Sequence, residues 1–170
     1  MALAKQDTDI IRALAEQVAE IAALPVQQVR RELWTSVNRL ERVRPPIHVQ
    51  AIAWNIWEEL LPKATLQTTD PFCQGQEFDL RKRIYCWEHL QDDRVVEDLV
   101  RCPVAIRGDA PSTHFGLPRE TDNPGDRSGA HGYRSVIVEE SDIDKIETEP
   151  VVTVDWDETE RRYQQLCELY

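Results

Sequence analysis

The residues best suited to bind a ligand gather in one short stretch of the chain. Trp54 and Trp57 follow directly after an extended apolar run, and Glu58 and Glu59 lie beside them. Open α/β sheets and barrels place ligand sites just past the carboxyl ends of their strands, so this stretch is a candidate binding site. The two tryptophans also stand at helical spacing with Leu61, and a core-facing stripe is the commoner reason for that spacing. Acid–base chemistry by either glutamate requires a buried carboxyl with a raised pKa.

A second group of chemically capable side chains lies in a glycine-rich stretch. Two of the four histidines, His114 and His131, share this stretch with Asp109, Asp122 and Asp126. Imidazoles and carboxylates are metal ligands, but the polarity of a solvent-exposed loop accounts for them as well, so we predict no metal site. The sequence also lacks the glycine-rich phosphate loops, the zinc-protease helix, the nucleophile elbow and the calcium-binding loop.

Charge excludes several classes of partner. The 170 residues carry 31 acidic and 20 basic side chains, a formal net charge of −11, which disfavours nucleic acid and anionic membranes. Ten of the acids lie between residues 139 and 160 with Lys145 as the only base, and we expect them to form a solvated acidic face. The basic run Arg81, Lys82 and Arg83 could hold an anionic ligand, although such a run more often pairs with nearby acids.

Cysteine usage and hydropathy indicate the compartment. The four cysteines include no Cys-x-x-Cys pair, which suits reduced, partly buried thiols better than disulfides or a zinc site. No apolar run approaches the roughly 18 residues that a membrane span needs, and the amino terminus lacks the apolar stretch of a signal peptide. We therefore predict a cytoplasmic protein that does not span a membrane.

Residues 1–44 are predicted to form a helical arm that would position these side chains. Apolar residues recur at three- and four-residue steps from Ile10 to Leu24, and again up to Leu40 after Pro25, a favourable first residue of a helix. The double proline that follows ends the pattern. The two stripes can pack as an antiparallel hairpin within the chain, or they can form a seam for self-association.

Residues 45–170 are predicted to form an α/β portion. The run IHVQAIA over 47–53 alternates as a strand and leads into a short helix over 54–61. Asp70 and Pro71 supply an N-cap and a first-turn proline for a helix that runs to about Leu90. The remaining predictions are an extended segment or two short strands within 95–106, a long loop over 107–133 and short strands over 134–138 and 151–154. A helical turn is predicted over 141–146 and a final helix over 157–170.

Several phrases of the sequence are shared with one known family. They are WTSVNRLERVRPP at 34–46, WEELLP at 57–62, DPF at 70–72, LRKRIYCWEHLQDDRVVED at 80–98 and HFGLPRE at 114–120, with the closing acidic strand and helix at 151–170. In these phrases the chain resembles the amino-terminal part of uroporphyrinogen-decarboxylase-like proteins of anaerobic bacteria. The resemblance covers most of the chain after about residue 30.

This resemblance implies the leading portion of a (β/α)8 barrel, α+β in isolation. Members of the family decarboxylate porphyrinogens or transfer methyl groups in corrinoid- or cobalamin-dependent metabolism, often with zinc activating a thiol. Such barrels need about 250 residues, so this chain alone is expected to be catalytically silent and to bind no cofactor. The zinc ligands of the family fall later in the barrel, and no residue here is assigned to zinc.

The same resemblance narrows the reaction and the site. The decarboxylases carry an arginine in the loop after their first strand, whereas residues 50–60 contain none, which favours the methyltransferase type. The residues placed to contact substrate or corrinoid are Gln50, Trp54, Asn55 and Glu58, although helix capping and core packing also account for them.

A partial barrel would leave apolar surface exposed, which predicts binding to a second polypeptide, self-association through the helical stripes, or contact with a corrinoid protein. The alternative is a self-contained α+β binding or adaptor module that meets a basic partner through its acidic face and the 107–133 loop. A third hypothesis is a small metal-dependent enzyme built on His114 and His131.

Overall fold

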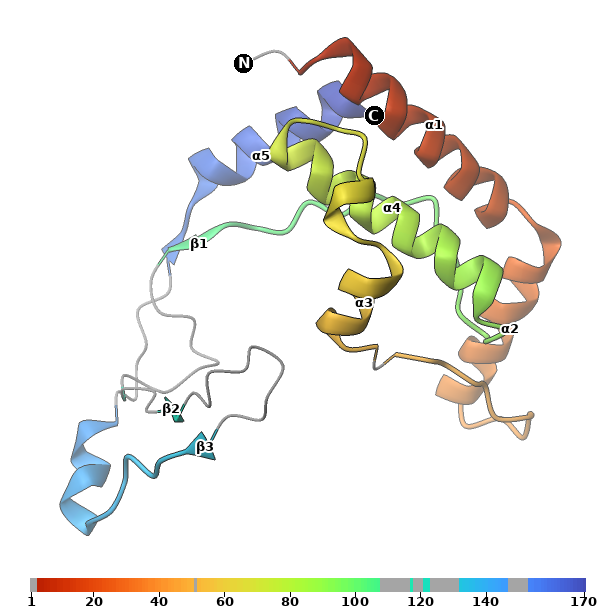
Figure 1. Cartoon of the computed structure of the whole chain (residues 1–170). Helices are drawn as coiled ribbons and strands as arrows, with labels where there is room; N and C mark the ends of the chain where they lie inside the picture. Colours follow the sequence, from red (N-terminus) through yellow and green to blue (C-terminus); the bar gives the residue numbers. More distant parts are fainter. Residues whose placement is uncertain (1–2, 51, 108–116, 118–120, 123–131, 147–152) are drawn as a thin grey trace. The chain divides into compact units, whose positions relative to one another are not determined.

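The computed structural model of the chain describes residues 3–50, 52–107, 117, 121–122, 132–146 and 153–170 (Figure 1). The chain divides into two compact units, one of residues 1–101 with 165–170 and the other of residues 102–164. The described residues are mostly helical, with two antiparallel pairs of very short strands, so the architecture is α+β. None of the helices in these residues is long and apolar enough to cross a membrane.

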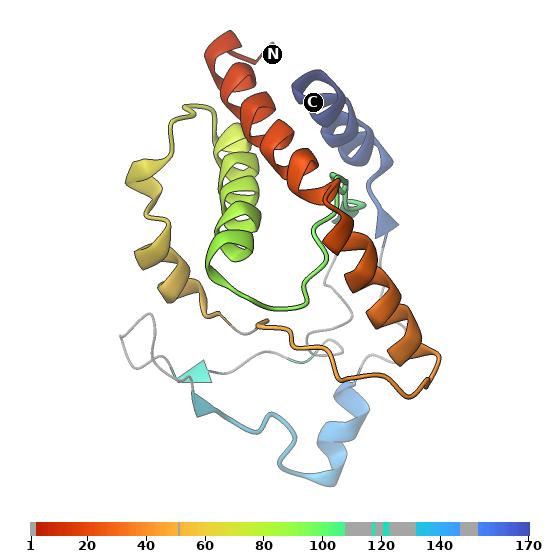
Figure 2. The same cartoon turned by 90° about the vertical axis from the view of Figure 1, so that its right-hand side faces the viewer.

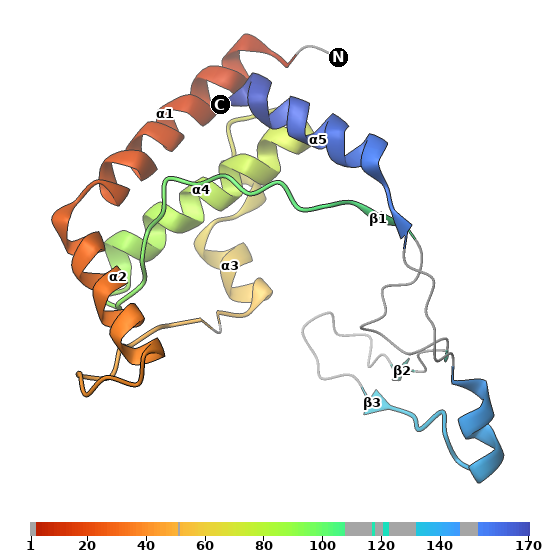
Figure 3. The ribbon, with the colours of Figure 1, turned by 180° about the vertical axis from the view of Figure 1, so that it is seen from behind.

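The core of the first unit forms between helices α1 (Lys5–Ala22) and α4 (Pro71–His89), which lie side by side and run in the same direction (Figures 1 and 3). The predicted apolar stripe of α1 is buried here, because Ile11, Leu14 and Val18 pack with Leu80 of α4. The stripe of α1 therefore serves packing within the chain. The end of the chain joins this core through Leu169, which is fully buried.

The beginning of α4 is fixed by two aspartates. Asp70 caps the helix as predicted, accepting hydrogen bonds from the backbone N–H groups of Phe72 (2.9 Å) and Cys73 (3.2 Å). The buried carboxylate of Asp7 in α1 accepts from the backbone N–H groups of Thr69 (3.1 Å) and Asp70 (2.9 Å). These hydrogen bonds hold the first turn of α1 next to the residues that precede α4.

Helix α2 (Pro25–Asn38) begins at the predicted proline but ends before the predicted double proline. Two backbone hydrogen bonds close the last turn of α2. The Leu40 N–H donates to the Val37 carbonyl, and the Glu41 N–H donates to the Ser36 carbonyl. This way of ending a helix requires one residue with a left-handed backbone conformation, and that residue is Leu40, with φ 59°. The local closure ends the helix, so the prolines further on are not what stops it.

Side chains on α2 bind the segment that follows α4. Gln27 accepts a hydrogen bond from the Val96 N–H (2.9 Å), Arg30 donates to the Arg94 carbonyl (2.9 Å) and Trp34 donates to the Asp93 carbonyl (2.8 Å). α2 therefore extends beyond α1 (Figure 2) and docks on residues 93–96, rather than forming an antiparallel hairpin with α1.

The strand predicted over 47–53 is not formed by the described part of that segment, and this prediction is wrong. The backbone there is held by side chains instead of a neighbouring strand. The N–H of Ile47 donates to the Asp93 carboxylate (2.8 Å), and the N–H of Val49 donates to the Asp92 carboxylate (3.0 Å). Because these two acceptors replace a sheet partner, the alternating pattern does not produce a strand.

The segment leads into α3 (Trp54–Leu60), which confirms the predicted short helix, and then into the 3-10 helix η1 (Lys63–Thr65).

In the second unit, strands β1 (Ile106–Arg107) and β4 (Thr153–Val154) pair in antiparallel fashion, as do β2 (Thr121–Asp122) and β3 (Gly132–Tyr133). Helix α5 (Trp156–Leu169) follows β4, as predicted, and its last residues belong to the first unit.

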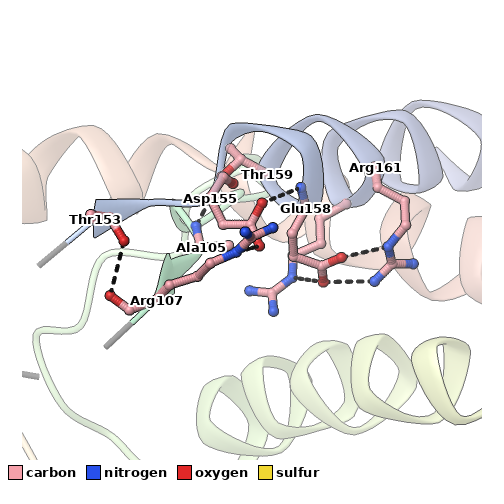
Figure 4. Close-up of polar contacts among 8 residues, drawn as sticks. Ala105, Arg107, Thr153, Asp155, Glu158, Thr159 and Arg161 are labelled. Carbon is pink, nitrogen blue, oxygen red and sulfur yellow. Dashed lines mark hydrogen bonds and ion pairs between the residues drawn. The ribbon is translucent and has the colours of Figure 1, made fainter. Parts of the chain in front are cut away.

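Polar contacts join the first strand pair to the start of α5 (Figure 4). The Arg107 guanidinium donates a hydrogen bond to the Asp155 carboxylate (2.6 Å), and the Asp155 N–H donates to the Ala105 carbonyl (2.8 Å). The Ala105 N–H donates to the Thr159 hydroxyl (3.0 Å). These hydrogen bonds connect β1 and the residue before it to the first turn of α5.

The predicted strand over 134–138 is also absent. The N–H groups of Val138 and Glu139 both donate to the Asp142 carboxylate, at 2.9 and 3.0 Å. These bonds start the 3-10 helix η2 (Glu140–Lys145), which confirms the predicted helical turn. Local capping thus takes the hydrogen bonds that a strand would have needed. Most of the predicted 107–133 loop lies outside the described residues.

Candidate functional site

A groove of about 560 Å³ lies in the first unit between the α3 region and α4. Its walls are mainly apolar and aromatic, and a few polar side chains stand among them. The apolar members include Trp54, Trp57, Leu61, Leu66 and Phe78, and the polar members are Glu58, Lys63, Gln74 and Lys82. Concave apolar sites of roughly 300–1,000 Å³ with a few polar groups are typical of small-molecule binding.

The two tryptophans of the groove have different environments. Trp57 is buried, and its ring meets Tyr85 edge-on with centroids 5.7 Å apart. The ammonium of Lys82 lies 5.0 Å from the centre of the Trp57 ring, a cation–π distance. Trp54 is 46% exposed and lines the groove. Core packing therefore explains Trp57, whereas Trp54 is a partly exposed residue of the groove lining.

The structure brings only part of the predicted residue set together. Trp54 and Glu58 line the groove, while Gln50 and Asn55 are not among its lining residues. Glu58 and Glu59 are both exposed, so neither has the burial that an acid–base carboxyl requires.

Glu77 on α4 fixes the loop of Gln67 and Thr68, which follows the groove residue Leu66. Its carboxylate is fully buried and accepts hydrogen bonds from the backbone N–H groups of Gln67 (2.9 Å) and Thr68 (2.8 Å), from the Thr68 hydroxyl (2.8 Å) and from Arg81 (2.7 Å). Burial by itself raises the pKa of Glu77, but these hydrogen bonds outweigh it and lower the pKa below its usual value. Leu66 and Pro71 of the groove flank this loop.

The sequence analysis missed Glu77, although a signal was present. Glu77 lies four residues after Cys73 and three before Leu80, both of which are buried on α4. An acid at a core position of an amphipathic helix, followed by Arg81 one turn later, indicates a buried carboxylate with a built-in partner.

Gly75 gives the groove an open point on α4. A Cβ atom at this position would meet nothing within 4 Å, and Gly75 lines the groove. A side chain can therefore begin here without a clash at its Cβ atom, on the side of α4 that lines the groove.

The described residues offer no alternative metal centre. They hold no group of three or more His, Cys, Asp or Glu side chains that could bind a metal ion. The two loop histidines of the metal hypothesis, His114 and His131, lie outside the described residues.

The predicted acidic face is partly compensated by bases. Asp142 pairs with Lys145, and Glu158 pairs with Arg161 (2.6 Å) and Arg162 (2.7 Å). The two arginines lower the pKa of Glu158 to about 2. Several carboxylates of the stretch thus hold local structure in the second unit.

The arrangement of the groove suits the binding of a small molecule. It offers aromatic and apolar surface, an ammonium and a carboxylate, and its two neighbouring glutamates are exposed to solvent. Comparison of the chain with protein-family models, with curated proteins and with solved structures gave no significant match.

Proposed function

We propose that the chain is the amino-terminal portion of a uroporphyrinogen-decarboxylase-like protein of the corrinoid-dependent methyl-transfer type. In this proposal it forms the leading part of a (β/α)8 barrel in the cytoplasm, is inactive without the rest of the barrel, and contributes a wall that contacts the corrinoid or substrate. The observation that carries the contact role is the aromatic groove, which contains Trp54 and Glu58 of the predicted set.

Exposed apolar side chains support the need for a second polypeptide. The exposed fraction is 61% for Val29, 93% for Leu40 and 63% for Ile47. Val29 and Leu40 belong to the apolar stripe of the arm, and Ile47 follows it. The proposal expects these side chains to form part of an interaction surface. A complementing barrel chain, a corrinoid protein or a second copy of this chain would cover it.

Free thiols support the cytoplasmic part of the proposal. All four cysteines are unpaired, and Cys73 and Cys86 are buried. Reduced cysteines are the usual state in the cytosol. Zinc enters the proposal only through the family, and no residue of this chain is assigned to it.

Hydroxocobalamin binding tests the contact role. Because the chain alone is expected to bind no cofactor, we would measure uptake by equilibrium dialysis with the full chain mixed with the product of an adjacent reading frame, for the natural chain and for two variants at one position. Gly75→Leu places a branched side chain in the groove, whereas Gly75→Ala changes the same residue and leaves the groove open. Both variants replace a helical glycine, which favours the helix by about 0.5–1 kcal/mol for alanine, so neither is expected to unfold α4.

The proposal expects saturable binding that Gly75→Leu weakens at least about tenfold, a loss of roughly 1.4 kcal/mol, while Gly75→Ala binds like the natural chain. Absence of saturable binding, or equal binding by all three proteins, would refute the contact role of the groove.

A self-contained α+β binding module is the second candidate. It is favoured by five exposed carboxylates on the second unit, at Glu139, Glu140, Asp144, Asp157 and Glu160, which could meet a basic partner. Size-exclusion chromatography with light scattering separates the two candidates. Aggregation alone, or a stoichiometric complex with the product of an adjacent reading frame, supports the barrel portion, and a stable monomer indifferent to that product supports the module.

A further inference from the structure

We propose that a second hollow in the first unit, between α4 and residues 94–101, binds an oxyanion: the phosphate or carboxylate group of a small ligand. Four basic side chains line it, Lys82 and Arg83 from α4 and Arg94 and Arg101 from the returning segment. This site lies outside the groove discussed above, with which it shares Lys82 alone. It does not depend on the family assignment.

The hollow exists because the chain reverses after α4 and runs back along the helix, as Figure 3 shows. The reversal is held where the Arg83 guanidinium donates to the Leu99 carbonyl at 2.9 Å. The space enclosed is about 310 Å³, with Val95, Val96 and Leu99 among its lining residues. Such a volume accommodates a phosphate or a small organic acid.

The charge of the hollow runs against that of the chain. Its four bases face two lining acids, Asp79 and Glu97, and Asp92 pairs with Arg94 (3.7 Å), which leaves a local excess of one positive charge in a protein with a net charge of −11. A concave site with an excess of one sign of charge concentrates ligands of the opposite sign. The partner predicted by this site is therefore anionic.

Lys82 is the cation best placed to accept such a ligand. Its neighbours Arg81 and Arg83 pair with Glu77 (2.7 Å) and Asp79 (2.8 Å), as expected for a basic run on a helix. Among the described residues Lys82 makes no ion pair, and its recorded contact is with the Trp57 ring. No carboxylate of the described residues therefore neutralises its charge.

Arg94 supplies a second, already oriented cation. One end of its guanidinium donates to the Val49 carbonyl at 2.6 Å, and its backbone N–H donates to Asp92. Its Nε–H is buried and has no hydrogen-bond partner among the residues that the structure describes. A buried donor left unmatched is costly and indicates a group that the chain itself does not supply. The guanidinium also lies 3.7 Å from the Asp92 carboxylate, so the side chain is anchored by an ion pair and keeps one unmatched donor.

Arg101 forms the exposed rim of the hollow. It pairs with Glu97 at 2.9 Å, but the arginine side chain is 79% exposed. Exposed pairs of this kind are weak, so an entering anion can exchange with Glu97 at little cost.

The test is isothermal titration of the full chain at low ionic strength with inorganic phosphate in one arm and succinate in the other. Saturable binding of phosphate, succinate or both supports the site, and the preferred anion identifies the ligand group. Lys82→Gln is expected to weaken binding about tenfold, as loss of a charge-assisted contact would. Lys5→Gln removes the same charge from an exposed position at the start of α1 and is expected to leave binding unchanged.

Two results would overturn the proposal. One is the absence of saturable binding of either anion below about 10 mM, the range of very weak association. The other is equal weakening by Lys5→Gln and Lys82→Gln, which would indicate the overall charge and no site. Gly75→Leu separates this test from that of the proposed function, because Gly75 does not line the hollow and anion binding should survive a blocked groove.

Discussion

Replacing Glu77 tests whether one buried carboxylate holds the loop of Gln67 and Thr68. In the natural chain Glu77 accepts hydrogen bonds from Gln67, Thr68 and Arg81 with no exposure to solvent. Glu77→Gln keeps the shape and one oxygen, which can still accept from the Gln67 and Thr68 donors. The amide then faces Arg81 with a donor, so the charge-assisted bond is lost, at a cost of about 2 kcal/mol.

Glu77→Leu removes every acceptor. The backbone N–H groups of Gln67 and Thr68 and the Arg81 guanidinium then lose their partner at a buried site, where each unmatched donor costs roughly 1–3 kcal/mol. With partial rescue by water and side-chain rotation, we expect a loss of about 4 kcal/mol, the usual cost of breaking a buried pair. Since domains are stable by only about 5–15 kcal/mol, this variant should be severely weakened.

Urea unfolding followed by far-ultraviolet circular dichroism measures both losses. With a slope of about 2 kcal/mol per molar urea, the midpoint should fall by about 1 M for Glu77→Gln and by about 2 M for Glu77→Leu. Glu88→Gln is the matched control, because Glu88 lies on the same helix with a side chain 57% exposed and should change stability by less than about 0.5 kcal/mol. Equal losses of stability for the two Glu77 variants, or no loss beyond that of the control, would refute the role of the Glu77 carboxylate in holding the loop of Gln67 and Thr68.

The direction of the pKa of Glu77 adds a pH dependence to the same experiment. A carboxyl whose pKa is lowered by folding stabilises the protein above its unfolded pKa, about 4.3, and loses that contribution as the pH falls through the folded value. The stability gap between the natural chain and Glu77→Gln should therefore shrink on acidification below about pH 4.3. A gap that widens in acid would contradict the assignment.

Three further predictions concern stability and thiol chemistry. Leu40→Gly should raise stability by about 0.5–1 kcal/mol in urea unfolding, because Leu40 has φ 59° and is 93% exposed, so glycine relieves backbone strain without loss of packing; a lower midpoint would contradict this. Leu169→Ala should cost about 2–5 kcal/mol in the same assay, because the side chain is fully buried in the first unit's core, and an unchanged midpoint would show that the end of the chain does not dock there. Titration with an aromatic disulfide reagent at pH 8 should modify Cys167 at once, because this thiol is exposed. Cys73 and Cys86 should react only after unfolding, because burial raises the pKa of Cys86 and raises that of Cys73 to about 11. Rapid reaction of three or more thiols in the folded chain would be inconsistent with this burial.

Local signals determined most of the helices. Pro25 and the pair Asp70 and Pro71 mark helix starts because a missing N–H and a capping carboxylate act within one turn. The apolar periodicity of α1 likewise predicted the face that is buried. For the candidate site, the sequence pointed to Trp54 and Glu58 because both lie on α3 next to an apolar run.

The tertiary structure decided what depends on residues distant in the chain. The segment 47–53 alternates like a strand, yet Asp92 and Asp93, more than forty residues later, accept hydrogen bonds from the N–H groups of Val49 and Ile47, and the described residues of the segment form no strand. The burial of Glu77 and the convergence of Lys82 with Arg94 likewise arise only when α4 packs and the chain reverses after it. Periodicity reports which face of an element is apolar, whereas the partner of that face, and of each backbone N–H group, is set by the fold as a whole.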